Sequence, residues 1–336
     1  ARLTLSMARR QQLASPMSEF LGITAVGVIL VFGGSLVAKG VLDPGGFIAF
    51  IAIFSQITRP VRTFIDQFAN INQGIAAGER IFSIIDTKPE IQDKPGAREL
   101  TGLKEKIEFR DVHFTYDGER EVIDGISFEI RRGQTVALVG PSGGGKSTLS
   151  ELLPRFYDVT GGSVTVDGID VRNMPQAQLH DLLGYVPQKG VLFSGTIGSN
   201  LKFGGEHITD ADVKKAAAIA QATEFIDAKP QGYESPIAQG GSNVSGGQKQ
   251  RLSIARAIAK DPKIYLFDDS FSALDYKTDV ALRRALKAQT DNATVLIVAQ
   301  RISTVLHANQ ILVLDEGRLV GKGTHAQLMV SCPEYQ

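Results

Sequence analysis

Hydrophobic residues follow two different patterns along the chain, and the first is typical of a membrane protein. Residues 20–38 contain no charged side chain, and a run of that length is enough for a helix that crosses a bilayer. Residues 43–46 are a turn sequence, and residues 47–71 are first apolar and then amphipathic with helical spacing. A buried helix in a large soluble core is the alternative for the first run. The pattern predicts a helical hairpin with two membrane spans, at about residues 20–40 and 46–64.

Basic residues flank both predicted spans on the same side of the membrane. Arg9 and Arg10 precede the first apolar run, and Arg59 and Arg62 follow the second. Because positively charged flanks stay in the cytoplasm, we expect the turn at residues 39–46 outside. We therefore expect residues 1–86 to be a partial transmembrane domain in the cell membrane, plasma or inner, whose second helix projects into the cytosol.

From residue 105 onward the pattern changes to short buried runs that alternate with amphipathic segments. Residues 87–104 are rich in proline, glycine and charge, which predicts a linker. Strands are predicted at residues 107–116, 126–130, 135–139, 163–167, 263–267 and 293–299. Helices are predicted at residues 149–153, 211–222, 246–260 and 279–289. This alternation indicates an α/β domain with a largely parallel core sheet, residues 105–336, in the cytoplasm.

Composition adds limits to this picture. The chain has 336 residues, which suits about two domains. Basic and acidic residues number 36 each, so the net charge gives no reason to expect a nucleic-acid partner. The single cysteine, Cys332, excludes an intramolecular disulfide and a multi-cysteine metal site, and we expect it to be inert.

The segment from Gly140 to Thr148 has the sequence of a phosphate-binding loop. It fits G-x-x-x-x-G-K-[ST], with a predicted strand before it and a predicted helix after it. Such a loop turns backbone N–H groups toward an anion, and a chance glycine turn would lack this setting. We expect Lys146 to reach the β- and γ-phosphates of ATP and Ser147 to ligate Mg²⁺. The nucleotide-binding residues predicted in this loop are Gly140, Ser142, Gly143, Gly144, Gly145, Lys146, Ser147 and Thr148.

Three other residues fit nucleotide chemistry because they accompany this loop. Asp268 ends a predicted strand beside the loop, where a carboxylate holds Mg²⁺ directly or through water. Gln188 is a candidate Mg²⁺ ligand and γ-phosphate sensor. Tyr116 is a candidate for stacking on adenine, although such a residue is more often an ordinary strand aromatic. The predicted metal ligands are Ser147, Gln188 and Asp268.

A second helix start has the character of an anion site. Val244–Gln248 opens the helix predicted at residues 246–260 and follows a glycine-rich stretch at residues 240–243. A glycine-rich helix N-terminus favours a phosphate group, and a glycine N-cap without a ligand is the alternative. One chain is thus predicted to carry two phosphate-binding ends.

Taken in order, these segments resemble the ATP-binding cassette of an ABC transporter, specifically a bacterial multidrug or lipid exporter half-subunit whose membrane part precedes the cassette. The resemblance covers essentially the whole chain. It implies an α/β P-loop NTPase fold with a RecA-like core, an antiparallel β subdomain and a helical subdomain. It identifies Tyr116 as the A-loop aromatic, Gly140–Thr148 as the Walker A loop, Gln188 as the Q-loop glutamine and Asp268 as the Walker B aspartate. The signature is Val244, Ser245, Gly246, Gly247 and Gln248, with valine where leucine is usual, and the D-loop is Ser272, Ala273, Leu274 and Asp275.

The resemblance also implies partners. In this family two cassettes dimerise head to tail, and each ATP lies between the Walker A loop of one and the signature of the other. The implied ligands are ATP and Mg²⁺, and the implied partners are a second exporter half, membrane lipid and a hydrophobic lipid or drug-like transported substrate. ATP sandwiching would close the cassettes and hydrolysis would reopen them, which gives alternating access.

Three positions depart from the family pattern. Asp269 stands where a glutamate usually polarises the attacking water, Gln300 stands where the switch histidine is usual, and Gln239 stands where an acidic residue precedes the signature. Aspartate is one methylene shorter, and a displacement of about 1 Å in a positioned base costs about 10²-fold in rate. Glutamine cannot transfer a proton as histidine does. We therefore expect Asp269 and Gln300, the predicted catalytic residues, to form an ATPase site that binds ATP and hydrolyses it slowly; tolerated variation is the alternative.

These departures resemble the degenerate-site subunit of heterodimeric bacterial exporters, so a heterodimer is favoured over a homodimer. The hairpin itself, however, resembles homodimeric lipid exporters. Exporter halves of this kind usually have six transmembrane helices, and two are predicted here, so we expect the sequence to be partial.

Two other function classes stay open. One is a non-hydrolysing regulatory or nucleotide-gated subunit. The other is a soluble-type cassette ATPase of DNA repair or chromosome organisation, and the apolar span argues against it.

Overall fold

The computed structural model describes residues 20, 22–100, 102–290, 293–301 and 305–336. The chain divides into two compact units, residues 1–88 and residues 89–336. Arg9 and Arg10, on which part of the predicted orientation rests, lie outside the described residues.

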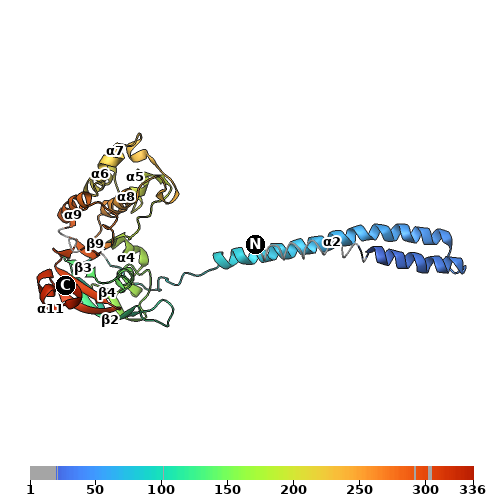
Figure 1. Cartoon of the computed structure of the whole chain (residues 1–336), viewed down its shortest axis with the longest axis horizontal. Helices are drawn as coiled ribbons and strands as arrows, with labels where there is room; N and C mark the ends of the chain where they lie inside the picture. Colours follow the sequence, from blue (N-terminus) through green and yellow to red (C-terminus); the bar gives the residue numbers. More distant parts are fainter. Residues whose placement is uncertain (1–19, 21, 101, 291–292, 302–304) are drawn as a thin grey trace. The chain divides into compact units, whose positions relative to one another are not determined.

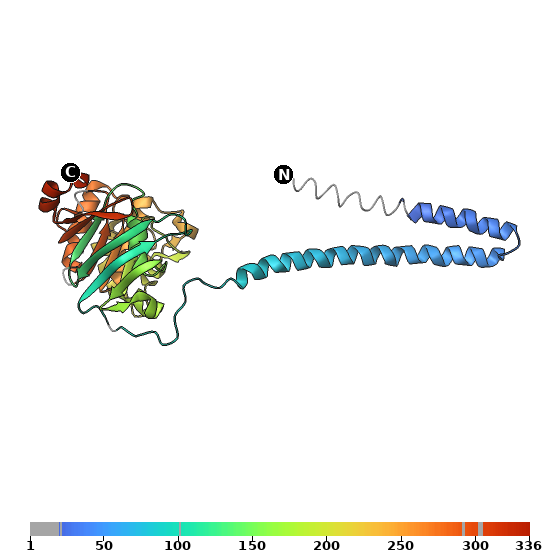
Figure 2. The same cartoon turned by 90° about the horizontal axis from the view of Figure 1, so that it is seen from below.

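The N-terminal unit is a helical hairpin. Residues 22–38 are helical, and α2, Pro44–Ile85, runs back alongside them in both views (Figures 1 and 2). The first helix ends where Gly40 adopts a φ of 74°, a left-handed conformation that glycine takes without strain. Asp43 caps α2 by accepting a 2.8 Å hydrogen bond from the amide of Gly46, and Pro44 occupies the first turn.

Close contact between the two helices depends on a glycine. Gly33 is buried, and a Cβ atom there would lie 2.1 Å from a ring carbon of Phe47. Most other large apolar side chains of this unit are exposed, Ile84 to 77%. The sequence predicted membrane spans at residues 20–40 and 46–64. Among the described residues no helix combines the length and the apolarity that a membrane span needs, so these two spans are not confirmed.

The C-terminal unit is built on two sheets. The four-stranded antiparallel sheet has the order β2-β1-β4-β5, and the six-stranded sheet has the order β12-β11-β3-β10-β9-β6. All neighbours in the larger sheet are parallel except β11 and β12. The strand bounds are β1 Lys106–Phe114, β2 Ile123–Arg131, β3 Thr135–Val139, β4 Gly161–Val166, β5 Ile169–Asp170, β6 Leu183–Val186, β7 Gly195–Thr196, β8 Pro236–Ile237, β9 Ile264–Asp268, β10 Thr294–Val298, β11 Gln310–Asp315 and β12 Arg318–Gly323.

Strand β3 shows why the larger sheet is a core sheet. Val136 and Leu138 point into a hydrophobic cluster shared with the antiparallel sheet, and Ala137 points into a second cluster shared with the helices. With both faces covered, a parallel strand is apolar along its whole length rather than at alternate positions. This explains the continuous run at residues 135–139.

Helices α5 to α8 gather apart from the two sheets (Figure 1) and form a helical subdomain. Three of them begin at capping residues: Thr196, Thr209 and Ser245 precede α5, α6 and α8, and each closes a capping box with the residue three positions on. The helix bounds of this unit are α3 Lys146–Leu152, α4 Gln176–Leu182, α5 Ile197–Lys202, α6 Asp210–Ile219, α7 Thr223–Asp227, α8 Gly246–Ala259, α9 Tyr276–Thr290 and α11 His325–Ser331.

Each predicted strand and helix of this unit has a counterpart, with shifted ends. The strand predicted at residues 107–116 ends at Phe114, so Tyr116 lies beyond it. The helix predicted at residues 211–222 ends at Ile219. The predictions missed ten elements that are only two to seven residues long, because such runs are too short to show a clear hydrophobic period. These are strands β5, β6, β7, β8, β11 and β12 and helices α4, α5, α7 and α11.

Candidate nucleotide-binding site

Three parallel strands end at the same edge of the core sheet and bring the candidate residues together. Strand β3 leads into the loop from Gly140, β9 ends at Asp268, and β10 leads toward Gln300. Strand β10 lies between β3 and β9, and Asp268 at the end of β9 still reaches the phosphate loop, where Ser147 donates a hydrogen bond to it. The carboxyl ends of parallel strands are where open α/β sheets bind ligands.

A cavity of about 770 Å³ opens at this edge. Its walls come from the phosphate loop and from the segments after β6, β9 and β10. Of the predicted site residues, those that line it are Gly140, Ser142, Gly143, Gly145, Lys146, Ser147, Thr148, Gln188, Asp269 and Gln300. Gly144 lies in the same loop and donates its amide to the carbonyl of Pro141 at 3.2 Å.

Lys146 is held inside the loop. Its ammonium donates hydrogen bonds to the carbonyls of Gly140 at 2.9 Å and Pro141 at 2.6 Å, and the residue is only 7% exposed. Burial lowers the pKa of Lys146 from its ordinary value, while Asp269 and Asp268 act in the opposite direction. The loop thus presents a desolvated cation beside the first turn of α3, whose amides have no intrahelical partners.

Ser147 and Asp268 form a direct pair. The Ser147 hydroxyl donates a 2.9 Å hydrogen bond to Asp268 Oδ1. Asp268 is buried, and burial raises the pKa of its carboxyl above the ordinary value; Asp269 adds to this, and the Ser147 hydrogen bond and Lys146 oppose it. A buried carboxylate with a raised pKa beside a hydroxyl is a pair that a divalent cation would stabilise.

Asp269 has an unusual backbone conformation. Its φ is 43°, in the left-handed region that aspartate enters more readily than most residues. Its amide donates to the carbonyl of Val298 at 3.0 Å, and its carboxylate accepts a 3.3 Å hydrogen bond from Gln188 Nε2. The residue therefore links the ends of three strands.

Gln300 and the predicted D-loop lie next to Asp269 along the same wall. Ser272 donates its hydroxyl to the carbonyl of Asp269 at 2.9 Å. Arg301 donates to the carbonyl of Ser272 at 2.9 Å, which ties the residue after Gln300 to the D-loop. Asp275 caps α9 by accepting a hydrogen bond from the amide of Thr278 at 3.0 Å.

Tyr116 is a predicted nucleotide-binding residue that does not line the cavity. It is 54% exposed, and its hydroxyl pairs with Thr148 Oγ1 at 3.0 Å. Nine lining residues were not predicted as site residues. Five of them are close neighbours in sequence of predicted residues: Val139, Pro141, Val298, Ala299 and Arg301. The other four carry no motif, and tertiary packing brings them to the cavity: Val122, Val305, Glu334 and Tyr335.

Comparisons with known proteins agree with this geometry. The profile of the ABC transporter family matches residues 123–272. The chain is 39% identical, over 99% of its length, to a protein of Desulfotalea psychrophila named ATP-dependent lipid A-core flippase. It is 42% identical, over 94% of its length, to the protein of Albidiferax ferrireducens with the same name. The nucleotide-binding part of this chain is an ABC transporter ATP-binding cassette. It spans 58% and 54% of these two relatives.

A solved structure of a bacterial Atm1-family ABC exporter with ATP bound is also similar to this ABC cassette and its N-terminal hairpin. The TM-score is 0.79 at 36% identity, with 97% of this chain and 57% of that chain covered. The α/β P-loop NTPase fold of an ABC cassette is therefore established for the C-terminal unit.

The signature of the cassette lies away from its Walker A cavity. None of the described signature residues lines that cavity. Ser245 and Gln248 close the capping box of α8: Ser245 Oγ accepts from the Gln248 amide at 3.2 Å, and Gln248 Oε1 accepts from the Ser245 amide at 3.0 Å. A Cβ atom on Gly247 would lie 3.5 Å from the carbonyl of Ala273, so signature and D-loop are neighbours. Val244 is buried in the helical subdomain.

The donor set of the cassette fits Mg²⁺. Mg²⁺ prefers oxygen ligands, and the Ser147 hydroxyl and the Asp268 carboxylate stand 2.9 Å apart beside the phosphate loop. Burial raises the pKa of the Asp268 carboxyl, so a cation bound beside it would offset part of the cost of its charge. Gln188 supplies an amide oxygen at the rim of the same cavity.

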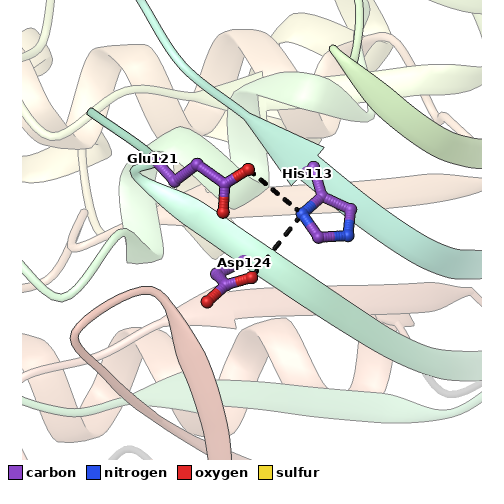
Figure 3. Close-up of side chains that lie close together, drawn as sticks. All are labelled: His113, Glu121 and Asp124. Atoms are coloured by element: carbon purple, nitrogen blue, oxygen red, sulfur yellow. Dashed lines mark ion pairs between the residues drawn. The ribbon is translucent and has the colours of Figure 1, made fainter. Parts of the chain in front are cut away.

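A second group of polar side chains lies on β1, on β2 and in the segment between them, outside this cavity. The His113 ring is 3.4 Å from a Glu121 oxygen and 3.6 Å from Asp124 Oδ1 (Figure 3), and its other nitrogen is 3.5 Å from Asp111. Arg318 binds the second oxygen of Asp124 at 2.6 Å and lowers the pKa of that carboxyl. With a guanidinium already on Asp124, this cluster is an ion-pair network at the edge of the antiparallel sheet.

Proposed function

We propose that the chain is the C-terminal part of an ABC exporter half-subunit, which uses ATP to move a lipid or a hydrophobic drug-like molecule across the cell membrane. The observation that carries the proposal is the cavity lined by Lys146, Ser147, Asp269 and Gln300, with Asp268 hydrogen-bonded to Ser147. Two relatives named as lipid A-core flippases support a lipid as the transported substrate. The sequence similarity extends over 99% and 94% of this chain, which includes most of the N-terminal hairpin.

Residues 1–86 belong to the membrane domain in this proposal. Most large apolar side chains described in this stretch are exposed, as in Val31 at 78% and Ile84 at 77%, and such a surface calls for lipid or other helices around it. The linker at residues 87–104 then joins this domain to the cytoplasmic cassette, residues 105–336.

The cassette's own site is proposed to bind Mg·ATP. Lys146 and the loop amides would hold the β- and γ-phosphates, while Ser147, Gln188 and Asp268 would hold Mg²⁺ and Tyr116 would contact adenine from the rim. Bound Mg²⁺ neutralises charge that develops on the transferring phosphoryl group.

Hydrolysis at this site is proposed to be slow. Asp269 is one methylene shorter than the usual glutamate, and its carboxylate already accepts a hydrogen bond from Gln188. Gln300 lines the cavity but has no titratable group. Together these residues can orient a water and contact the γ-phosphate, but they provide a poorly placed base.

A second exporter half completes the assembly. The signature residues Ser245–Gln248 would face the ATP on the partner's Walker motifs, because they do not line the cavity of their own chain. Since this signature departs from the family pattern only at Val244, the partner's site would be the faster one. A heterodimer is therefore proposed, with the degenerate site regulating alternating access.

The test is ATP turnover by the full-length subunit purified alone into lipid nanodiscs, with and without Asp269→Glu combined with Gln300→His. Near-zero turnover that rises strongly in the double variant supports a degenerate site and a heterodimer. Full turnover by the unchanged homodimer would overturn both. Transport of fluorescent lipid by the pair, dependent on Mg·ATP, tests the export function itself.

The substitutions at Asp269 and Gln300 also favour a second candidate, a non-hydrolysing regulatory or nucleotide-gated subunit. This candidate predicts that the reconstituted pair binds ATP and responds to it without turnover. Steady ATP hydrolysis by the pair excludes it.

A further inference from the structure

One buried glutamine fastens the loop that carries Gln188 to the signature helix. Gln250 lies on α8 and is 2% exposed. Its Nε2 donates to the carbonyl of Pro187 at 3.1 Å, and its Oε1 accepts from the amide of Gly190 at 3.0 Å. The two bonded residues flank Gln188 and Lys189, so a single side-chain amide closes this loop at both ends.

Backbone packing reinforces the same junction. A Cβ atom on Gly190 would lie 2.9 Å from the carbonyl oxygen of Lys249 and 2.9 Å from Ser253 Oγ, both on α8. Such distances leave no room for a side chain, so the loop backbone rests directly on the helix. The contact is therefore built from two independent features, a buried amide and a close backbone approach.

Arg256 extends the contact one turn further along α8. Its guanidinium donates to the carbonyls of Val191 at 3.0 Å and Asn200 at 2.9 Å. Positions 250, 253 and 256 are spaced by three and share one face of the helix. This face holds the segment from Pro187 to Asn200, so that segment and α8 form one packed body.

We propose that Gln250 is a positioning residue that sets the place of Gln188 relative to Asp269 and carries movement of the signature helix to this chain's own nucleotide site. The proposal rests on the proposed function, in which the start of α8 faces the partner's ATP. Gln188 Nε2 is 3.3 Å from Asp269, so a displacement of the loop alters the contact between them. A helix is stiff along its axis, and a shift at Ser245 therefore reaches Gln250, which lies about one and a half turns further on.

The test compares Gln250→Met with Ser253→Ala in the full-length subunit in nanodiscs. Methionine keeps the length of the side chain but makes neither hydrogen bond. Ser253 is a matched control because it is buried on the same helix face and its hydroxyl has no hydrogen-bond partner among the described residues. The readouts are ATP affinity in EDTA and the Mg²⁺ concentration that gives half-maximal thermal stabilisation by ATP.

We expect Gln250→Met to keep ATP affinity in EDTA within about twofold of the wild-type value, because the Walker A loop is intact. The same variant should raise the half-maximal Mg²⁺ concentration about tenfold, which is the order expected for lost hydrogen bonds. Ser253→Ala should change neither readout. Gly190→Ala, which lifts the loop from α8 while Gln250 is retained, should act in the same direction as Gln250→Met and serves if the methionine variant does not fold.

A double-mutant cycle with Gln188→Ala separates positioning from general destabilisation. If Gln250 acts through Gln188, its substitution has no further effect on the Mg²⁺ requirement in the Gln188→Ala background. An equal effect in both backgrounds, or an unchanged Mg²⁺ requirement in Gln250→Met and Gly190→Ala, overturns the inference. Failure of the wild-type subunit to bind Mg·ATP would instead overturn the proposed function.

Discussion

Gln188 Nε2 donates a 3.3 Å hydrogen bond to Asp269 Oδ2 and so joins the segments that follow two neighbouring strands, β6 and β9, beside the phosphate loop. The bond occupies an oxygen of the carboxylate that is predicted to stand at the general-base position. This hydrogen bond restrains the position of the Asp269 side chain, and a change in the length of that side chain should therefore change turnover.

Separate substitutions should distinguish the two departures at the site. Asp269→Glu lengthens the carboxylate arm, and we expect turnover to rise by up to about 10²-fold, the cost of a displacement of about 1 Å in a positioned base. Gln300→His should make turnover depend on pH. Turnover should rise with increasing pH through an apparent pKa of about 6.5, as the imidazole loses its proton. Turnover measured from pH 5.5 to 8.5 tests both, and the Asp269→Glu single variant should lack the histidine limb. Equal pH profiles for the two variants would contradict this assignment.

Lys146→Met should weaken nucleotide binding. The ammonium now donates to two loop carbonyls, and with nucleotide present it would donate to phosphate oxygens. Loss of charge-assisted hydrogen bonds, about 1.5–3 kcal/mol, predicts about 10- to 100-fold lower affinity for ATP. Titration with a fluorescent ATP analogue measures it. Lys263→Ala is the control because its side chain is exposed and does not line the cavity, and an affinity loss of the same size in the control would refute a specific role.

Asp268→Asn should stabilise the nucleotide-free protein and abolish its response to Mg·ATP. Burial raises the pKa of Asp268, so the folded state binds more protons than the unfolded state just above the ordinary carboxyl pKa. Its charge therefore costs stability at neutral pH, and the cost disappears as pH falls through the raised pKa. We expect a higher unfolding temperature for the Asp268→Asn variant than for the wild type at pH 7, and a difference that shrinks toward pH 4.

Thermal unfolding with and without ligand completes this test. For the wild type at a Mg·ATP concentration about 100 times Kd, the stabilisation is about 2.7 kcal/mol, or roughly 5–10 °C. Asp268→Asn should lose most of that shift. A variant that is less stable without nucleotide at pH 7 would show that the Ser147 and Lys146 contacts outweigh the burial of the charge.

Two glycines of the Walker A loop should respond differently to alanine. Gly140 has a φ of 143°, and a Cβ atom there would lie 1.9 Å from the carbonyl oxygen of Leu314. Gly143 has a φ of 82°, but no atom lies within 4 Å of a Cβ atom built there. Backbone strain costs about 1–3 kcal/mol in each variant, and only Gly140→Ala adds a steric clash. Denaturant unfolding should therefore show the larger loss for Gly140→Ala; equal losses would mean that Leu314 moves aside.

Cys332 should be slow to react in the native protein. It is 2% exposed, and burial, together with a hydrogen bond to Glu334 at 3.3 Å, raises the pKa of its thiol. A raised pKa lowers the thiolate fraction at pH 7.5, and burial limits access. Labelling with iodoacetamide should be much slower than for glutathione and should become complete in guanidinium chloride. Native labelling at the rate of glutathione would contradict the buried position.

The sequence alone determined which chemistry this protein carries. The loop Gly140–Thr148, Gln188 and Asp268 follow one another in a fixed order, and local patterns reveal them because a phosphate loop needs glycine turns and a buried parallel strand is apolar throughout. The departures at Asp269 and Gln300 could also be read directly from the chain.

Tertiary structure decided which of these residues meet. Strand order placed β10 between β3 and β9, and no local pattern encodes strand order. Packing from distant segments brought Val122, Glu334 and Tyr335 to the cavity, and the Gln250 amide reaches residues 187 and 190 across some sixty positions of sequence. Such contacts depend on long-range burial of apolar faces and pairing of buried polar groups, so neither hydrophobic periodicity nor motif spacing could predict them.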